Sequence, residues 1–328
     1  MALLEAVEEA SLPAVLEELR EAPGLLTQGV VHVQAWYRRQ PHLPQPSDGK
    51  PLDEQLIRVF LRGCKHDLER TKRKIDAYFT SRGTVPALFQ RRDPRGERLQ
   101  RAMDILHVFP LPRLTAAGHR VTVHRMAPAL VKAARAAGAG AGPPVDVGAL
   151  VQLIFLVGEV RIREEPGAFA GDIFLFDFSG FAASHCAQVL ANASLVRDAL
   201  VAVQEAFPQR MHAIHLFNMH PAMEKILAFV KTIMKEKVRN RFHIHTTVES
   251  LHRHVPRAML PRALGGEEDR DLAREWRRKL ESYGPWAVAQ DLVVADEARR
   301  PLPPPGDKQR AAAQLFGCEG SFRRLAID

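Results

Sequence analysis

Residues 207–245 read FPQRMHAIHLFNMHPAMEKILAFVKTIMKEKVRNRFHIH and place a strand, an amphipathic helix, a basic run and a second strand in direct succession. The predicted strands are Ile214 to Phe217 and Phe242 to Thr246. The helix between them has an apolar face that is too rich for an ordinary surface. That face consists of Ile226, Leu227, Phe229, Val230 and Ile233.

The basic run follows this helix at once. It consists of Lys235, Lys237, Arg239 and Arg241, with only Glu236 against it. An apolar helix beside a positive segment favours an apolar pocket that opens toward an anionic surface. A core helix followed by a solvated basic turn accounts for the pattern equally well.

Length and composition indicate a globular chain with a basic balance. With 328 residues and 46% hydrophobic content, the chain can form one large domain or a small domain joined to a larger one, and we expect two. The net charge of +8 favours anionic partners, either phospholipid headgroups or nucleic acid, without choosing between them. Cys64, Cys186 and Cys318 are odd in number and far apart, which fits reduced thiols rather than a disulfide framework.

The first residues do not have the pattern of a secretory signal. MALLEAVEEASLPAVLEEL lacks a basic flank, and Glu5, Glu8 and Glu9 interrupt its apolar run. No apolar run approaches the length that spans a bilayer. We therefore expect a cytoplasmic protein that associates with membranes reversibly and from the surface.

Residues 1 to about 83 are predicted to be helical, and later residues to alternate strands with helices. The expected early helices are Leu12–Arg20, Val30–Arg39, one that Asp53 caps and that ends near Gly63, and Asp67–Ser81. Prolines at 94, 110 and 112 indicate a loop-rich connection. The expected later elements are a strand at His119–Met126, a helix ending near Ala137, a buried helix at Val147–Arg161, a strand at Gly171–Gly180, helix at Ala183–Ala206, the segment quoted above, and a helix at Glu267–Ser282. This order predicts an α/β layer with parallel pairing.

Several of these segments resemble the CRAL-TRIO lipid-transfer family. QPHLP from Gln40 and LIRVFLRGCKHDLERTKRKIDAYFTSR from Leu56 are similar to its helical N-terminal module. GDIFLFDFSG, FPQRMHAIHLFN, EKVRNRFHIH and LPRALGG stand where that family has a strand with terminal Asp and Gly, a Phe-Pro-x-Arg turn, a basic run and a Leu-Pro-x-x-x-Gly-Gly signature. The match covers about residues 30 to 282, and the chain resembles in particular insect members similar to alpha-tocopherol transfer protein, cellular retinaldehyde-binding protein and clavesin.

The resemblance implies a CRAL-TRIO lipid-binding fold: a parallel-rich sheet with flanking helices around one large apolar cavity, roofed by a movable lid helix at Pro221–Met234. A small all-helical module precedes it. The implied function is not enzymatic: the protein binds one lipophilic molecule, a tocopherol-, retinoid- or carotenoid-like lipid, and moves it between membranes. Burial is worth roughly 25 cal/mol per Å², so release requires the lid to open at a membrane. Lipid sensing or scaffolding without transfer is the alternative.

The expected cavity wall combines the buried helix, alternate strand positions and the lid. Its residues are Val151, Ile154, Phe155, Gly158, Phe174, Phe176, Leu216, Ile226, Phe229, Val230 and Ile233. A slip of one residue in a strand exchanges pocket residues for core residues, so a core role stays open for each of them.

The resemblance also implies that the basic run grips a phosphoinositide headgroup. By position Lys237 and Arg241 match the gripping residues most directly, and Lys235 and Arg239 follow. The family has a further basic residue where this chain has Cys64, and the adjacent Lys65 is the expected substitute.

Two further departures from the family pattern concern structure. Ala263 and Leu264 replace the usual Glu and Tyr before the paired glycines, and the Asn-x-Pro after the strand is stretched to span Asn218 to Pro221.

Competing functions have weaker support. Seven histidines lie within a short span of the sequence: His212, His215, His220, His243, His245, His252 and His254. Because no Cys or paired carboxylate joins them at ligand spacing, we expect no metal and no cofactor. The basic run contains no aromatic residue, which argues against nucleic acid.

Enzyme motifs are also weak. Asp177 is predicted to cap a turn rather than to act as an acid or hold magnesium, because no Gly-x-x-x-x-Gly-Lys loop is present. Ser179 lacks the Gly-x-Ser-x-Gly elbow of hydrolases. Gly138–Pro144, GAGAGPP, follows an Ala-rich helix rather than a strand and is predicted to be a linker.

We expect a monomer with three segments. These are a helical module at 1–95, a lipid-binding domain at 96–283 and a C-terminal tail at 284–328, irregular from about Arg299.

Overall fold

The computed structural model describes residues 2–45, 51–137, 142 and 144–301. Most of the predicted linker at 138–144, and the predicted tail beyond residue 301, lie outside the described residues.

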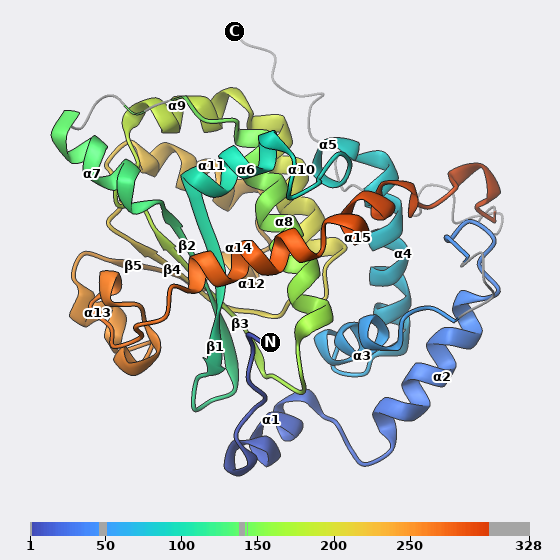
Figure 1. The fold of residues 1–328 in the computed structure, drawn as a ribbon. Coiled ribbons are helices and arrows are strands. Elements are labelled where there is room, and N and C mark those ends of the chain that lie inside the picture. The colour runs from blue at the N-terminus through green and yellow to red at the C-terminus, as the bar shows by residue number, and fades with distance from the viewer. Residues whose placement is uncertain (1, 46–50, 138–141, 143, 302–328) are drawn as a thin grey trace, which may run out of the picture.

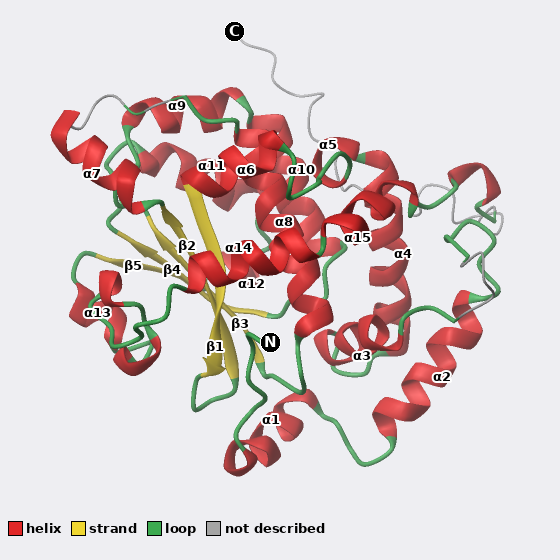
Figure 2. Cartoon of the chain, in the orientation of Figure 1, coloured by secondary structure: helices red, strands yellow, loops and turns green. Residues whose placement is uncertain are grey.

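The centre of the molecule is one five-stranded sheet, drawn in yellow in Figure 2, with the strand order β1-β2-β3-β4-β5. The strands are β1 (Leu106–Leu114), β2 (His119–Met126), β3 (Gly171–Asp177), β4 (Met211–Phe217) and β5 (Phe242–His245). β1 and β2 are antiparallel, and the other neighbouring pairs are parallel. The parallel-rich α/β prediction is therefore confirmed.

β1 corrects the prediction of a loop-rich connection. Pro110 and Pro112 lie inside this strand, which pairs with β2 alone and so forms an edge of the sheet. An edge strand tolerates residues without an N–H because one side of its backbone needs no strand partner. The register between β1 and β2 shifts after Pro110, where the regular ladder is interrupted.

The N-terminal region is helical, as predicted, and most of its helices lie at one side of the sheet, whereas the first lies below the sheet (Figure 1). Its helices are α1 (Leu12–Leu19), α2 (Leu25–Tyr37), α3 (Glu54–Gly63), α4 (Leu68–Thr84) and α5 (Pro86–Phe89). Asp53 caps α3 by accepting from the backbone N–H of Gln55, and Asp67 caps α4 by accepting from that of Arg70. Both caps satisfy backbone donors that have no partner within the first helical turn.

Helices fill the connections between strands. They are α6 (Glu97–Ile105), α7 (Pro128–Ala137), α8 (Val147–Glu164), α9 (Ala183–Ala191), α10 (Ala193–Glu205), α11 (Met223–Ile233), α12 (Glu236–Arg239), α13 (Val248–His252), α14 (Leu272–Ser282) and α15 (Gly284–Ala289). Short 3-10 helices occur at Glu9–Ser11, Arg257–Met259, Arg262–Leu264, Gln290–Leu292 and Glu297–Arg299.

The predicted helix at Ala183–Ala206 is two helices. α9 and α10 meet at Asn192 with a bend of 77°. Among the described residues no single helix has the length and apolar content of a membrane span, although these two reach them when taken together.

The two faces of the sheet pack against different groups. Ile173 and Leu175 of β3 join a large core with α6, α8 and α14. Phe174 and Phe176, the alternate residues of the same strand, pack on the other side with Ile214 and Leu216. Because successive side chains of a strand point to opposite faces, one set of residues joins the core and the other set is free to line a cavity.

A second core joins the N-terminal helices to the rest of the chain. Phe60, Tyr78 and Phe79 share it with Phe155 of α8 and Phe207. A Cβ atom at Gly63, the last residue of α3, would lie 2.0 Å from the carbonyl oxygen of Pro208. Only glycine therefore permits this close approach of α3 to the Phe-Pro turn.

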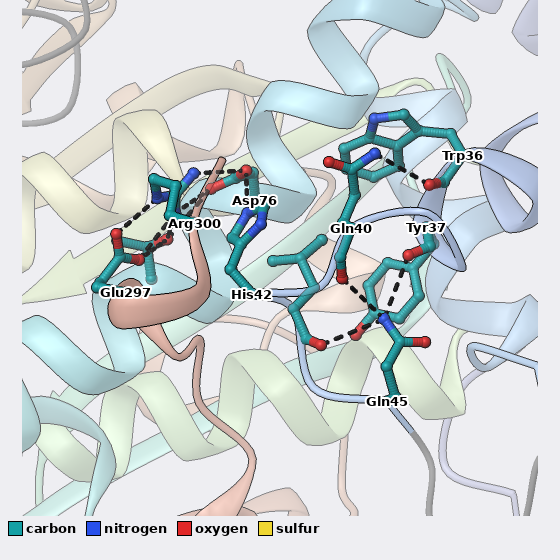
Figure 3. Close-up of polar contacts among 10 residues, drawn as sticks. Trp36, Tyr37, Gln40, His42, Gln45, Asp76, Glu297 and Arg300 are labelled. Atoms are coloured by element: carbon teal, nitrogen blue, oxygen red, sulfur yellow. Dashed lines mark hydrogen bonds and ion pairs between the residues drawn. The ribbon is translucent and has the colours of Figure 1, made fainter. Parts of the chain in front are cut away.

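The segment after α15 packs on the helical module. Arg300 donates to Asp76 of α4 and to Glu297, and Asp76 also contacts His42 at 2.9 Å (Figure 3). Figure 3 also shows Gln45 beside Tyr37 and Gln40. The described part of the predicted tail, residues 284–301, is thus ordered by contacts with the N-terminal helices.

Candidate functional site

A cavity of about 370 Å³ lies beside the sheet, within the range of small-molecule sites. Its wall is formed by β1 to β5 and by α8, α9, α10 and α11, together with the residues around them. Most of the wall is aliphatic, aromatic or thioether. The cavity is therefore suited to an apolar occupant.

The structure places nine of the eleven predicted residues on the wall. They are Val151, Ile154, Phe155, Gly158, Phe174, Phe176, Leu216, Ile226 and Val230. Phe229 and Ile233 are half-buried on α11 and do not line the cavity. Because successive residues turn by about 100° around a helix, the face of α11 toward the cavity is offset from the predicted one and consists of Met223, Ile226, Leu227 and Val230.

Several residues of the cavity wall were not predicted from the sequence. β2 contributes Thr122, His124 and Met126 to the cavity, while Val121 and Val123 face the main core. The alternation of side chains along β2 identifies these wall residues once the face of β2 that meets the cavity is known. α10 contributes Val196, Ala199, Leu200 and Val203.

α11 covers the cavity with one face and exposes the other. Met223 and Ile226 are buried, whereas Glu224, Lys225 and Ala228 are exposed. The sulfur of Cys186 on α9 lies 3.6 Å from that of Met223. α11 thus has the position expected of a lid helix.

Two charged groups on the cavity wall are already paired. Arg161 forms ion pairs with Asp172 at 2.7 Å and with Glu165 at 3.3 Å. Asp177 accepts from the backbone N–H of Ser179 and from the amide of Asn218, each at 3.0 Å. The predicted capping role of Asp177 is confirmed.

A second feature is a group of basic side chains at the amino ends of β2, β4 and β5. We name Lys65, Arg210, His212 and Arg241 the basic cluster. Arg210 precedes β4 and Arg241 precedes β5, and because these strands are parallel neighbours their amino ends meet. Burial and the positive charge of Arg210 lower the pKa of Arg241. Burial and then Arg241 lower the pKa of His212, whose ring stacks on His119 at 3.8 Å.

Glu18 of α1 lies within this cluster. Its carboxylate accepts from Lys65 at 3.0 Å and also pairs with Arg210. These two hydrogen bonds, with Lys65 the larger cause, lower the pKa of Glu18. A carboxylate of the chain itself therefore neutralises part of the basic cluster.

The predicted headgroup residues fall into two sets. Lys65 and Arg241 belong to the basic cluster, whereas Lys235 is exposed and pairs with Glu205 at 2.6 Å. Lys237 and Arg239 are exposed on α12 and form no ion pair within the described ranges. Sequence reasoning did not assign Arg210, although the Phe-Pro-x-Arg turn contains it.

Four of the predicted histidines meet on the face of the sheet opposite the cavity. Nδ1 of His215 lies 2.8 Å from Nε2 of His245, and the rings of His243 and His254 are each 5.0 Å from the ring of His215. Nδ1 of His245 contacts the hydroxyl of Ser250 at 2.5 Å. In the part of the chain that the structure describes, no group of three His, Cys, Asp or Glu side chains is arranged to hold a metal ion.

Comparison with protein families gives two matches. Residues 23–99 match the family described as Pinta-like, UBA domain, and residues 111–266 match the CRAL/TRIO domain. The first range covers α2 to α5, and the second contains β2 to β5 with α7 to α13.

Similar proteins agree with these matches. The chain is 28% identical over 257 residues to alpha-tocopherol transfer protein-like of Homo sapiens, covering 76% of this chain and 68% of that protein. It is 26% identical over 291 residues to the protein of the same name in Mus musculus, covering 88% and 76%, and 26% identical over 132 residues to clavesin-1 of Rattus norvegicus, covering 40% and 37%.

Among solved structures, the crystal structure of Sfh5 aligns with 88% of this chain and 99% of its own at 12% identity, with a TM-score of 0.45, a similarity too low to support an argument. The family match and the sequence relatives carry the assignment instead. Residues 111–266 are a CRAL/TRIO domain.

Proposed function

We propose that the protein binds one lipophilic molecule in the cavity and transfers it between membranes. The observation that carries this proposal is the apolar cavity of about 370 Å³ with α11 across it. Apolar surface of this extent gains free energy when an apolar ligand replaces water. The relatives named alpha-tocopherol transfer protein-like support the same function.

A tocopherol-, retinoid- or carotenoid-like ligand fits the wall better than a phospholipid. The two charged side chains that the structure describes on the wall, Arg161 and Asp177, already have partners. A zwitterionic headgroup would therefore be buried without free counter-charges, at a high desolvation cost.

Release of the ligand is proposed to occur when α11 moves away at an anionic membrane. The basic cluster and the exposed Lys235, Lys237 and Arg239 provide the attraction, with Lys237 and Arg241 the main contacts to a phosphoinositide headgroup. Each cationic residue near an anionic leaflet contributes about 1 kcal/mol, so several together support reversible binding. On this proposal the protein is a cytoplasmic monomer that visits membranes.

No catalytic step is part of the proposal. The hydroxyl of Ser179 accepts from Asn218 at 2.7 Å, and Asp177 is engaged in the same turn. These contacts form a turn rather than a nucleophile with an activating base. The segments 1–95, 96–283 and 284–328 remain our proposed domain division.

The proposal is tested first by extraction. Protein purified from its native source is extracted into organic solvent and analysed by mass spectrometry. We expect one stoichiometric lipophilic molecule. An empty extract from protein that also fails to take up retinol, tocopherol or a carotenoid would reject the ligand cavity.

A cavity-filling substitution tests the site itself. Ala199 is buried on the cavity wall, so Ala199→Phe should reduce retinol binding at least tenfold. Ala228→Phe adds the same side chain to the exposed face of α11 and serves as the control. Equal affinities of the two variants would place the ligand elsewhere.

A vesicle assay tests the membrane surface. Replacing Lys237 and Arg241 with Ala should weaken binding to vesicles that contain phosphoinositide, whereas replacing the exposed Arg38 and Arg101 removes the same charge elsewhere. Unchanged binding of the first variant would reject this site.

Lipid sensing or scaffolding without transfer is the alternative. Retinol transfer from donor vesicles with a quencher to acceptor vesicles without one separates the two functions. Fluorescence that rises with added protein supports transfer, and binding without such a rise supports sensing.

A further inference from the structure

Among the residues that the structure describes, five polar side chains lie on the cavity wall. They are Thr122, His124, Arg161, Asp177 and Gln209. Arg161 and Asp177 are paired, and no buried polar atom of Thr122 or Gln209 lacks a partner. Among the wall residues that the structure describes, the buried side-chain atom without a hydrogen-bond partner is Nδ1 of His124.

His124 is buried on β2, the second strand of the sheet. It lies on β2 between Val108 of β1 and Phe176 of β3, and it is 4% exposed. Its ring stacks on Phe176 with a centroid distance of 4.4 Å and an interplanar angle of 18°. Strand alternation directs this side chain to the cavity with Thr122 and Met126. Nδ1 itself is buried and has no hydrogen-bond partner.

The state of the ring follows from its surroundings. Burial lowers the pKa of His124 to about 4, so the imidazole is neutral at pH 7. Hydrogen bonds to the backbone oxygens of Leu175 and Thr122 act in the opposite direction, which requires a ring N–H as donor. Because Nδ1 has no partner, that donor is Nε2, and Nδ1 is left with a lone pair facing apolar surroundings.

We infer that the cavity selects a lipophilic molecule bearing one hydroxyl group, which donates a hydrogen bond to Nδ1 of His124. This inference rests on the proposed function and specifies its ligand: an alcohol or phenol rather than a hydrocarbon, an ester or an aldehyde. An unpaired polar atom in an apolar site costs free energy that such a ligand recovers. The same contact fixes which end of the ligand enters first.

The test uses the full chain and three probes of one shape: retinol, its deoxy hydrocarbon axerophthene, and retinaldehyde. His124→Phe keeps an aromatic ring and removes the acceptor. His124→Asn places an amide oxygen near the position of Nδ1 and keeps an acceptor. Binding is measured by retinoid fluorescence or quenching of tryptophan fluorescence.

We expect retinol to lose about tenfold in affinity in His124→Phe and to recover in part in His124→Asn. Axerophthene should bind both variants as it binds the unmodified protein, which also shows that they are folded. Equal losses for retinol and axerophthene, no loss for either, or a loss confined to retinaldehyde would each overturn the inference.

Failure of the proposed function looks different. If the unmodified protein binds none of the three probes and its native extract is empty, the ligand cavity itself is rejected. If the unmodified protein binds retinol and axerophthene, and the variants change the affinity for both ligands equally, the ligand cavity is supported and only the role of His124 is rejected.

Discussion

At the scale of single residues, one carboxylate neutralises part of the positive charge of the basic cluster. Glu18 comes from α1, outside both family matches, yet its side chain pairs with Lys65 and Arg210. An anionic headgroup that approaches these two cations has to compete with Glu18. On the proposed function, Lys65 would contact a headgroup only after its ion pair with Glu18 breaks.

We predict that Glu18→Gln strengthens binding to phosphoinositide vesicles several-fold, because it frees two cations and removes one negative charge. Glu17→Gln removes the same charge from an exposed neighbour on α1 and is the control. Vesicle co-sedimentation at several salt concentrations measures the effect. Equal gains in both variants would show that net charge, and not the contact, is responsible.

Buried histidines predict a loss of stability in acid. Burial, the largest cause in each case, lowers the pKa of His119 and of His124 to about 4 and that of His215 to about 3. In the unfolded chain these groups titrate near 6.5. Between these values the unfolded state binds more protons, so the free energy of unfolding rises with pH.

This contribution is fully present above pH ~6.5, is lost as the pH falls, and levels off below the folded-state values. Urea unfolding should show lower stability at pH 5 than at pH 7.5. His215→Phe should flatten this dependence more than replacement of the exposed His32 by Phe. An unchanged slope in His215→Phe would contradict the assignment.

At the scale of elements, α11 and α3 show how packing contacts position a helix. Only one face of α11 lines the cavity, and Phe229 and Ile233 do not lie on that face. α3 reaches the turn before β4 only because Gly63 has no side chain. This turn carries Arg210, so the approach of α3 also brings Lys65 toward Arg210.

We predict that Gly63→Ala destabilises the protein by about 1–3 kcal/mol, the usual cost of overpacking. Gly83 on α4 is the control, because a Cβ atom there would meet its nearest neighbours at 3.7 Å. Gly83→Ala should be neutral or stabilising by up to about 1 kcal/mol. Urea unfolding of both variants tests this, and equal stabilities would refute the close contact.

At the scale of the whole molecule, one buried carboxylate joins the helical module to the CRAL/TRIO domain. Glu159 of α8 pairs with Arg82 of α4 and, at 2.7 Å, with Arg92, and it accepts from Tyr78 at 2.6 Å. Burial opposes its charge, but the two guanidinium groups outweigh burial and hold the pKa of Glu159 at about 2. Both arginines are completely buried.

We predict that Glu159→Gln lowers the free energy of unfolding by about 3–5 kcal/mol, because it leaves two buried cations without a counter-charge. Glu97→Gln breaks an exposed pair with Arg101 and should cost at most about 1 kcal/mol. Urea unfolding followed by circular dichroism compares them. Similar losses in the two variants would mean that the buried cluster does not couple the parts of the chain.

The sequence by itself determined the fold class, the order of most elements and the resemblance to the CRAL/TRIO domain, because these follow from local periodicity, capping and motifs of neighbouring residues. GDIFLFDFSG predicts a buried parallel strand, and Asp53 and Asp67 cap the helices they were expected to cap. Prolines misled the prediction in β1, since their tolerance depends on an edge position that only the assembled sheet defines.

Only the tertiary structure decided which residues share a site. Nine of the eleven predicted wall residues line the cavity, but Phe229 and Ile233 do not, because the direction from which neighbours approach α11 is not encoded in its own periodicity. His124 beside Phe176, and Glu18 between Lys65 and Arg210, join segments distant in the chain. Such contacts depend on the packing of the whole molecule, so local patterns do not contain them.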